Sequence, residues 1–224
     1  MKYNDSNATE SREMIDIVDC DGITIGTAEK EVAHKLGLWH KSFHCWIVQE
    51  MSNKHYVLYQ KRGRSKLIFP NLYDISVAGH YNAAEGIEGG LREIREEIGI
   101  DVSLDNLINL GKKYDVFRSS DITNYEICDV MLLKLNIPIA ELKLAYPELE
   151  GIAMVELNNA LSLFGNKVEM ISASAILWNH DKQAWESCTV NLTTSSFTSR
   201  ADNYFFKILT TINSYINGHL SIDF

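Results

Sequence analysis

The sequence predicts an α/β fold, a sandwich built around a mixed β-sheet. Three observations support this class: strand-like apolar segments recur along the chain, helical patterns interrupt them, and an amphipathic helix stands near the end. The chain has 224 residues, of which 46% are apolar and only three are prolines, so it can bury a large core. We expect one domain spanning residues 1–224.

The N-terminal part, about residues 13–37, is expected to form a short hairpin and a short helix. Alternating apolar residues flank the sequence Asp19-Cys20-Asp21-Gly22, which is typical of a hairpin turn. Thr27 is suited to cap a helix over 28–36, and Gly37 is suited to end it.

The core of the domain is expected at about residues 38–165. The expected strands are 39–48, 55–60, 107–117, 125–135 and 152–155, and a helix is expected at 157–164. His40 and His44 both lie on the first strand. Side chains four residues apart on a strand share a face but lie about 13 Å apart, so we do not expect both to bind one ion.

The C-terminal extension, about residues 166–224, has a clear pattern only near its end. Residues 168–178 are apolar without a period, and 181–199 are rich in Ser and Thr. Apolar residues then recur at helical spacing over 204–216, with Gly218 as a stop. This amphipathic helix must dock on the same domain or across a homodimer.

The stretch 79–100 has the strongest functional pattern. It predicts a helix over 91–98 in which Glu93, Glu96 and Glu97 share one sector and the apolar residues share another. Carboxylates at this spacing repel one another by roughly 0.2–0.5 kcal/mol per pair, and a cation relieves the repulsion. Oxygen ligands of this kind favour Mg²⁺ or Mn²⁺. A solvated surface helix is the alternative.

Arg92 directly precedes these acids and follows Glu85 by seven residues, about two helical turns. An ion pair between them would tie the loop to the helix and hold the carboxylates in orientation.

The same stretch resembles the Nudix box, Gly-x5-Glu-x7-Arg-Glu-x2-Glu-Glu-x-Gly followed by an apolar residue. The matching positions are Gly79, Glu85, Arg92, Glu93, Glu96, Glu97, Gly99 and Ile100. One residue is missing, because six residues (86–91) separate Glu85 from Arg92 where the pattern has seven. The deletion falls at the junction of loop and helix and leaves the role of Glu85 open.

The resemblance covers about residues 13–165 and is to the isopentenyl diphosphate isomerase branch of the Nudix superfamily and its hydrolase relatives. It includes the runs 19–22, 37–43, 60–62 and 74–80. It implies a Nudix-type α/β/α sandwich. Isomerases carry a catalytic cysteine directly before the Gly-His pair, where this chain has Ala78, whose methyl group can neither donate nor accept a proton.

The resemblance therefore favours a Mg²⁺-dependent hydrolase that cleaves a diphosphate linkage in a small phosphorylated metabolite or nucleotide derivative. Isomerases also tend to lose the box acids, which are complete here. An isomerase-like enzyme is the alternative, and a non-catalytic ligand-binding module is a third possibility that the intact acids disfavour.

The resemblance also implies roles for individual residues. Glu96 and Glu97 would be the main metal ligands, Glu93 a ligand or base, and Arg92 the residue that orients them. Further candidates are His80, His40 and Glu126, which align with isomerase metal positions and would form a second metal site or a substrate site, in which His80 binds substrate, or would be core polar groups. Glu126, Glu148 and Glu150 are candidates for a carboxylate beyond the box.

A basic turn, residues 61–66, contains four cationic residues in six. Arg62 and Arg64 are candidates to hold substrate phosphates, with a solvated turn as the alternative.

Net charge, cysteine spacing and the length of the apolar runs argue against several other functional classes. A net charge of −9 disfavours binding to nucleic acid polymers or anionic membranes. The four cysteines form no Cys-x2-Cys pair. No apolar run reaches the roughly 18 residues of a membrane span, and the first residues lack the apolar region of a signal peptide. We expect a cytoplasmic protein whose partner is a small-molecule diphosphate.

Overall fold

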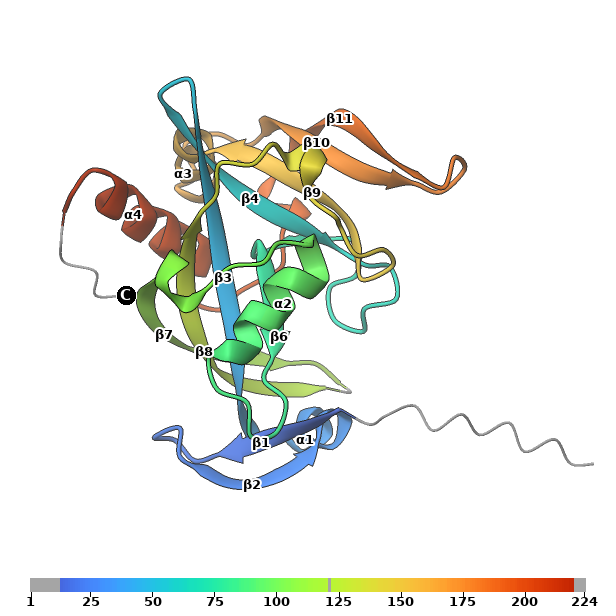
Figure 1. Cartoon of the computed structure of the whole chain (residues 1–224), viewed down its shortest axis with the longest axis vertical. Helices are drawn as coiled ribbons and strands as arrows, with labels where there is room; N and C mark the ends of the chain where they lie inside the picture. Colours follow the sequence, from blue (N-terminus) through green and yellow to red (C-terminus); the bar gives the residue numbers. More distant parts are fainter. Residues whose placement is uncertain (1–12, 121, 220–224) are drawn as a thin grey trace, which may run out of the picture.

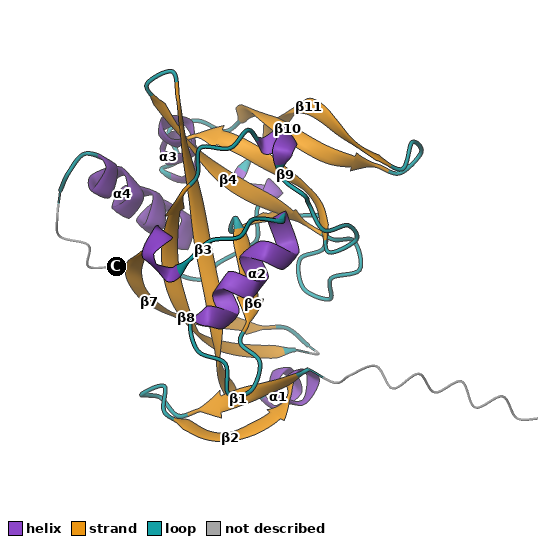
Figure 2. Ribbon diagram, in the orientation of Figure 1, coloured by secondary structure: helices purple, strands orange, loops and turns teal. Residues whose placement is uncertain are grey.

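The computed structural model describes residues 13–120 and 122–219, which form a large mixed sheet with helices on both faces (Figures 1 and 2). The strands are β1 (Met14–Val18), β2 (Thr24–Glu29), β3 (Trp39–Met51), β4 (Lys54–Arg62), β5 (Tyr73–Asp74), β6 (Val77–His80), β7 (Leu107–Arg118), β8 (Thr123–Lys134), β9 (Leu149–Glu156), β10 (Ile171–Asn179) and β11 (Ala184–Leu192). The helices are α1 (Lys30–Leu36), α2 (Glu88–Ile98), α3 (Leu157–Phe164) and α4 (Tyr204–Ile216).

The predicted mixed sheet is confirmed. Its main path runs β11-β10-β9-β4-β3-β1-β2, while β5 joins β4, and β6 and β8 join β3. The pair β3–β8 is parallel and the others are antiparallel. Helices α3 and α4 pack on one face of the sheet and α2 on the other. Among the described residues, no helix has the length and apolarity needed to cross a membrane.

The C-terminal helix docks on its own chain, one of the two expected arrangements. Its apolar side, including Tyr204, Phe205 and Ile208, is buried against the core. Phe205 stacks on Phe164 of α3 with ring centroids 4.8 Å apart. Burial of a large aromatic side chain of this kind contributes roughly 1.5–3 kcal/mol, so the extension is held by its own packing.

The N-terminal hairpin is confirmed as β1 and β2, but the predicted start of the following helix is wrong. Thr27 lies in β2, opposite Asp16, and α1 begins only at Lys30. The strand pairing uses the backbone groups of residues 27–29, which are then not available to a helix. The predicted stop is confirmed, since Gly37 has φ +66°.

Strands β10 and β11 form a hairpin in a segment where the sequence indicated no element. β10 alternates buried and exposed residues at first, but Ala175 and Ile176 are both buried because the strand packs on both faces there. β11 is mostly exposed and lies at the edge of the sheet, where pairing with β10 holds it.

Candidate active site

Arg92 holds three carboxylates of the 79–100 stretch at once. Its Nε and Nη2 each donate to Glu85 at 3.1 Å, and its Nη1 lies 2.9 Å from Glu93 and 3.0 Å from Glu96. Nη2 also donates to the carbonyl of His80. The hydrogen bond from Arg92 lowers the pKa of Glu85. One guanidinium therefore fixes the loop, the end of β6 and the helix together.

The missing residue of the 79–100 stretch is absorbed at the start of α2. The helix begins at Glu88, three residues before the expected start, and glycines occupy the next two positions. A Cβ at Gly89 would overlap Glu85, and one at Gly90 would overlap the ring of Phe43. Close packing of the first turn thus keeps Glu85 within reach of Arg92.

Glu97 is the buried member of the three helix acids, with 6% of its surface exposed. Its Oε2 accepts hydrogen bonds from the backbone N–H of Ala78 at 3.3 Å and from Gln60 at 3.5 Å. Burial, followed by the charge of Glu93, raises the pKa of Glu97 to about 8. Glu97 is poorly solvated because α2 packs tightly on β6.

Glu93 shares this environment, whereas Glu96 does not. Burial raises the pKa of Glu93, although Arg92 opposes the shift. A Cβ at Gly79 would overlap the Glu93 carboxylate, so glycine is required for this approach of helix and strand. The Glu96 side chain is 56% exposed. Two poorly solvated carboxylates beside an exposed one form an oxygen donor set that fits Mg²⁺ or Mn²⁺.

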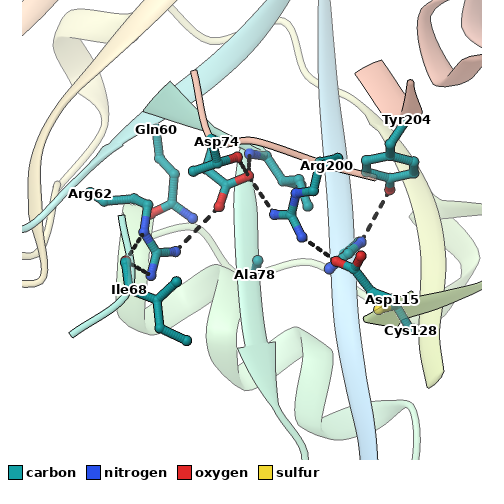
Figure 3. Close-up of polar contacts among 12 residues, drawn as sticks. Gln60, Arg62, Ile68, Asp74, Ala78, Asp115, Cys128, Arg200 and Tyr204 are labelled. Carbon is teal, nitrogen blue, oxygen red and sulfur yellow. Dashed lines mark hydrogen bonds and ion pairs between the residues drawn. The ribbon is translucent and has the colours of Figure 1, made fainter. Parts of the chain in front are cut away.

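The basic turn is tied down by acidic neighbours. Arg62 donates to the carbonyl of Ile68 and to Asp74, so its guanidinium braces the loop (Figure 3). Arg64 lies 3.4 Å from Glu150, and Lys66 lies 2.5 Å from Glu148. Glu148 and Glu150, two of the three candidate carboxylates beyond the box, thus lie next to the basic turn.

A second cluster brings together His34, His40, His80 and Glu126, whose candidate ligand atoms all lie within 4.8 Å of one another. The three rings pack with centroids 5.1 to 5.3 Å apart. Glu126 lies 3.1 Å from His80 Nε2 and 3.9 Å from His40 Nε2. Nε2 of His34 and of His40 are buried and have no hydrogen-bond partner among the described residues.

The electrostatics of this cluster fit a cation. Burial and the neighbouring His80 and His40 lower the pKa of His34 to about 4, which keeps the ring neutral. Burial opposes ionisation of Glu126, but the hydrogen bond from His80 and the proximity of His80, His40 and His44 hold its pKa well below the usual value. Imidazoles with a lowered pKa, as at His34 and His40, and an ionised carboxylate are a common donor set for transition metals.

His34 was not among the residues singled out from the sequence. It comes from the last turn of α1, and the left-handed backbone at Gly37 turns the chain so that the His34 ring meets that of His40 on β3. The spacing His34-x5-His40 is the available signal. This spacing indicates a shared site only when the helix that carries His34 is known to fold back on the strand that carries His40. His44 lies outside this cluster, as its spacing from His40 on the strand predicts. Its Nδ1 shares a hydrogen bond of 3.1 Å with the hydroxyl group of Tyr204.

A relative with a similar length matches most of the chain. An uncharacterized Nudix hydrolase of Clostridium acetobutylicum is 31% identical over 174 residues, which cover 78% of this chain and 84% of the relative. The chain belongs to the Nudix hydrolase family. Isopentenyl-diphosphate Delta-isomerase of Mycolicibacterium vanbaalenii is 27% identical over 124 residues, covering 54% of this chain and 67% of the isomerase. The resemblance to this branch is thereby confirmed.

Among solved structures, the Deinococcus radiodurans protein DR0079 shares the fold, with a TM-score of 0.52 and 19% identity. The match covers 69% of this chain and 90% of that protein. No family model matches the chain.

The C-terminal extension of this Nudix hydrolase adds a buried charge network beside Ala78. Figure 3 shows Arg200 between Asp74 and Asp115, and it pairs with both. Asp115 also lies 3.3 Å from Lys113. His44, Asp115, Glu126 and Cys128 converge closely enough for a metal, but two cations already compensate Asp115. We therefore interpret the group of His44, Asp115, Glu126 and Cys128 as part of a buried charge network and not as a metal site.

Proposed function

We propose that this Nudix hydrolase cleaves a diphosphate linkage in a small phosphorylated metabolite or nucleotide derivative, and that it depends on Mg²⁺ or Mn²⁺. The observation that carries the proposal is the single guanidinium of Arg92, which holds Glu85, Glu93 and Glu96 beside the buried Glu97. Burial raises the pKa of Glu93 and of Glu97, so their ionised forms are costly unless a cation neutralises them.

Glu93, Glu96 and Glu97 would hold the cation. When bound, it neutralises phosphate charge and lowers the pKa of a bound water. Arg92 keeps the acids in place, and Glu93 accepts a proton or completes the ligand set. Glu97, fixed by Ala78 and Gln60, needs little reorganisation to bind, because its position is already set.

The basic turn would hold the substrate's phosphates. Arg62 braces the turn through Ile68 and Asp74, while Arg64 and Lys66 stand at its open end. Lys66 also lowers the pKa of Glu97, which supports a role for this cation beside the acids. Exchange of Glu148 for a substrate phosphate at Lys66 would keep the charge balanced and leave Glu148 available to the metal.

The cluster of His34, His40, His80 and Glu126 is proposed as a second cation site. His80 connects the two sites, because its carbonyl accepts from Arg92 and its ring contacts Glu126. Asn124 donates to Glu126 at 2.7 Å, and its Oδ1 is buried without a partner among the described residues. That oxygen is a further available ligand.

This second cluster is also the observation that favours an isopentenyl-diphosphate isomerase-like activity. Moving a double bond requires a proton donor and a proton acceptor on the two sides of the alkene. Glu126 is available on one side, but Ala78 stands where the isomerase resemblance places a cysteine. We therefore rank hydrolysis first.

One assay separates the two activities. The protein is incubated with nucleoside diphosphates, sugar nucleotides, dinucleotide polyphosphates and isoprenoid diphosphates, with Mg²⁺, Mn²⁺ or chelator. Released phosphate is measured together with double-bond migration by NMR. Metal-dependent phosphate release without migration is expected. Migration of isopentenyl diphosphate at an enzymatic rate would favour the isomerase instead.

A further inference from the structure

A cavity of about 480 Å³ lies between β7 and α4. Figure 1 shows this strand and this helix next to each other. Helix α4 packs on the face of the sheet opposite to α2, so the cavity is separate from the acids of the proposed catalytic site. Sites for small organic molecules have volumes of roughly 300–1,000 Å³, and the cavity is large enough for such a ligand. We call it the β7–α4 cavity.

The wall of this cavity is positively charged. Three lysines line it, Lys112, Lys113 and Lys207, and Asp202 is the one carboxylate among the described lining residues. This local excess of cations occurs in a chain whose net charge is −9. A concave surface with charges of one sign concentrates ions of the opposite sign, so the β7–α4 cavity favours an anion.

Lys113 is the buried cation of this wall, with only 4% of its side chain exposed. Its Nζ lies 3.3 Å from Asp115 and 3.2 Å from Asp202. The ammonium group also lies over the ring of Tyr204, 4.9 Å from the ring centre. Because these contacts fix the ammonium group, little conformational entropy is lost when it binds a ligand.

The carboxylates near Lys113 are shared with other cations. Asp115 also pairs with Arg200, and Asp202 also lies 3.7 Å from Lys207. The side chain of Lys207 is 58% exposed, so its ammonium group can turn toward a ligand. The same holds for Lys112, which is 58% exposed and whose nearest acid lies 3.9 Å away. The wall therefore keeps cationic groups that an anion can pair with.

Helix α4 adds an apolar surface to the cavity. Phe206 is half-buried, packs against the core and also lines the cavity. Thr210 and Thr211 line it one turn further along the helix, and their hydroxyl groups donate to the backbone carbonyls of Phe206 and Lys207. Those hydroxyl hydrogens are already in use, so the lysines are left to hold a charged group and Phe206 to contact an apolar one.

We propose that the β7–α4 cavity is a binding site for a small organic anion, in which a carboxylate or phosphate group is attached to an apolar body. The charged group would meet Lys113, with Lys112 and Lys207 at the rim, and the apolar body would lie on Phe206. The acids of α2 and the basic turn take no part. The site is therefore independent of the proposed hydrolysis.

Binding of three matched benzene derivatives tests the proposal. Benzoate, phenyl phosphate and the neutral benzamide are each titrated into the ¹⁵N-labelled full chain in chelator, so that no metal recruits the phosphate to α2. Backbone NMR shifts are followed. We expect saturable shifts at 112–114 and 206–211 with both anions, and binding of benzamide weaker by about tenfold or more, because a charge-assisted contact is missing. The tighter anion identifies the preferred charged group.

Replacing the two rim lysines together, Lys112→Met and Lys207→Met, should weaken binding of both anions by about tenfold or more. Both side chains are mostly exposed, so the double variant should fold. Lys134→Met is the matched control, because Lys134 is an exposed lysine of β8 that lies over Tyr215 on α4, outside the cavity wall. This control should bind the anions as the wild type does. Thermal melts verify that each variant is folded.

Equal affinity for benzoate and benzamide would overturn the proposal, as would equal anion binding by the wild type and the double variant. Shifts confined to other parts of the chain, or no saturable binding of either anion, would also overturn it. An equal loss of affinity in Lys134→Met would do the same, because the general charge of the surface would then explain the binding.

Discussion

Arg200 donates from the C-terminal extension to Asp74 at the end of β5, with Nη2 2.7 Å from Oδ1. Asp74 also accepts from Thr198 and from Arg62 of the basic turn (Figure 3). Because Asp74 is 2% exposed, both cations meet it in a poorly solvated place. The extension is therefore joined through one carboxylate to the turn proposed to hold phosphate.

Replacing Arg200 should destabilise the protein strongly. Arg200→Met removes the partner of two buried carboxylates, Asp74 and Asp115, and such a loss costs about 3–5 kcal/mol. Urea unfolding measures the change. Arg95→Met is the matched control, since its side chain is 62% exposed and its acidic neighbour lies 3.8 Å away. Equal stability of the two variants would show that the buried network contributes little.

Glu97→Gln should abolish most activity while the fold survives. The amide can still accept from Ala78 and Gln60, but it cannot supply a negative oxygen to a cation. We expect a fall in kcat/KM of about 10²-fold or more on a diphosphate substrate. Glu88→Gln, an exposed acid of the same helix, is the control. Full wild-type activity in excess chelator would refute the metal dependence.

The stability of the metal-free protein should fall as pH rises from about 6.5 to 8. Glu97 has a folded-state pKa of about 8 against a usual 4.5, so the folded protein holds a proton that the unfolded chain releases. This contribution is complete below pH 4.5 and is lost as pH rises through 8, by at most about 1.4 kcal/mol per pH unit. His34, with a lowered pKa, adds an opposite slope only below its usual pKa of 6.5.

Unfolding of wild type and Glu97→Gln in chelator, compared between pH 6.5 and 8, checks this. The variant should show a flatter profile and a higher stability at pH 8. Identical slopes would mean that Glu97 is not protonated in the folded state.

The sequence predicted most of the fold because its strands and helices have clear periods. The acidic helix and the helix at 204–216 each combine an apolar face with a glycine stop near the end. The β10–β11 hairpin was missed because β10 lacks a clear period and β11 is mostly exposed and depends on its partner strand. Thr27 was misplaced because a good N-cap residue also serves in a strand when a partner is present.

The candidate site was predicted only where its residues are local in sequence. Arg92 and Glu85 pair as their spacing indicated. The burial of Glu97 depends on Ala78 and Gln60, which come from other strands, and sequence spacing within a helix does not report such contacts. His34 and Arg200 likewise reach their clusters through tertiary packing.

The basic turn should respond to mutation at its open end. Arg64→Ala and Lys66→Ala are expected to lower kcat/KM by up to about 10²-fold if these cations hold transferring or leaving phosphates. Lys54→Ala is the control, because Lys54 is 55% exposed and pairs with Glu156 at the far end of β4. Changes in kcat/KM within about twofold at low salt, where surface charges act most strongly, would show that the turn does not hold phosphate and is only a solvated surface.

The histidine cluster should bind one transition-metal ion per chain. His34 is the decisive residue, because its Nε2 is buried without a partner among the described residues and its pKa of about 4 keeps it a neutral ligand near neutral pH. The protein is loaded with Mn²⁺ or Zn²⁺, dialysed, and its metal content is measured by mass spectrometry. His34→Asn should lower the bound metal by about one ion per chain, since one ligand is lost from a small donor set.

His55→Asn, on β4 beside Glu50, is the matched control and should keep the wild-type metal content. Glu97→Gln measured in parallel separates the two sites, because it should leave this tightly held ion in place. Unchanged metal content in His34→Asn would show that the cluster is a packed group of neutral rings and not a metal site.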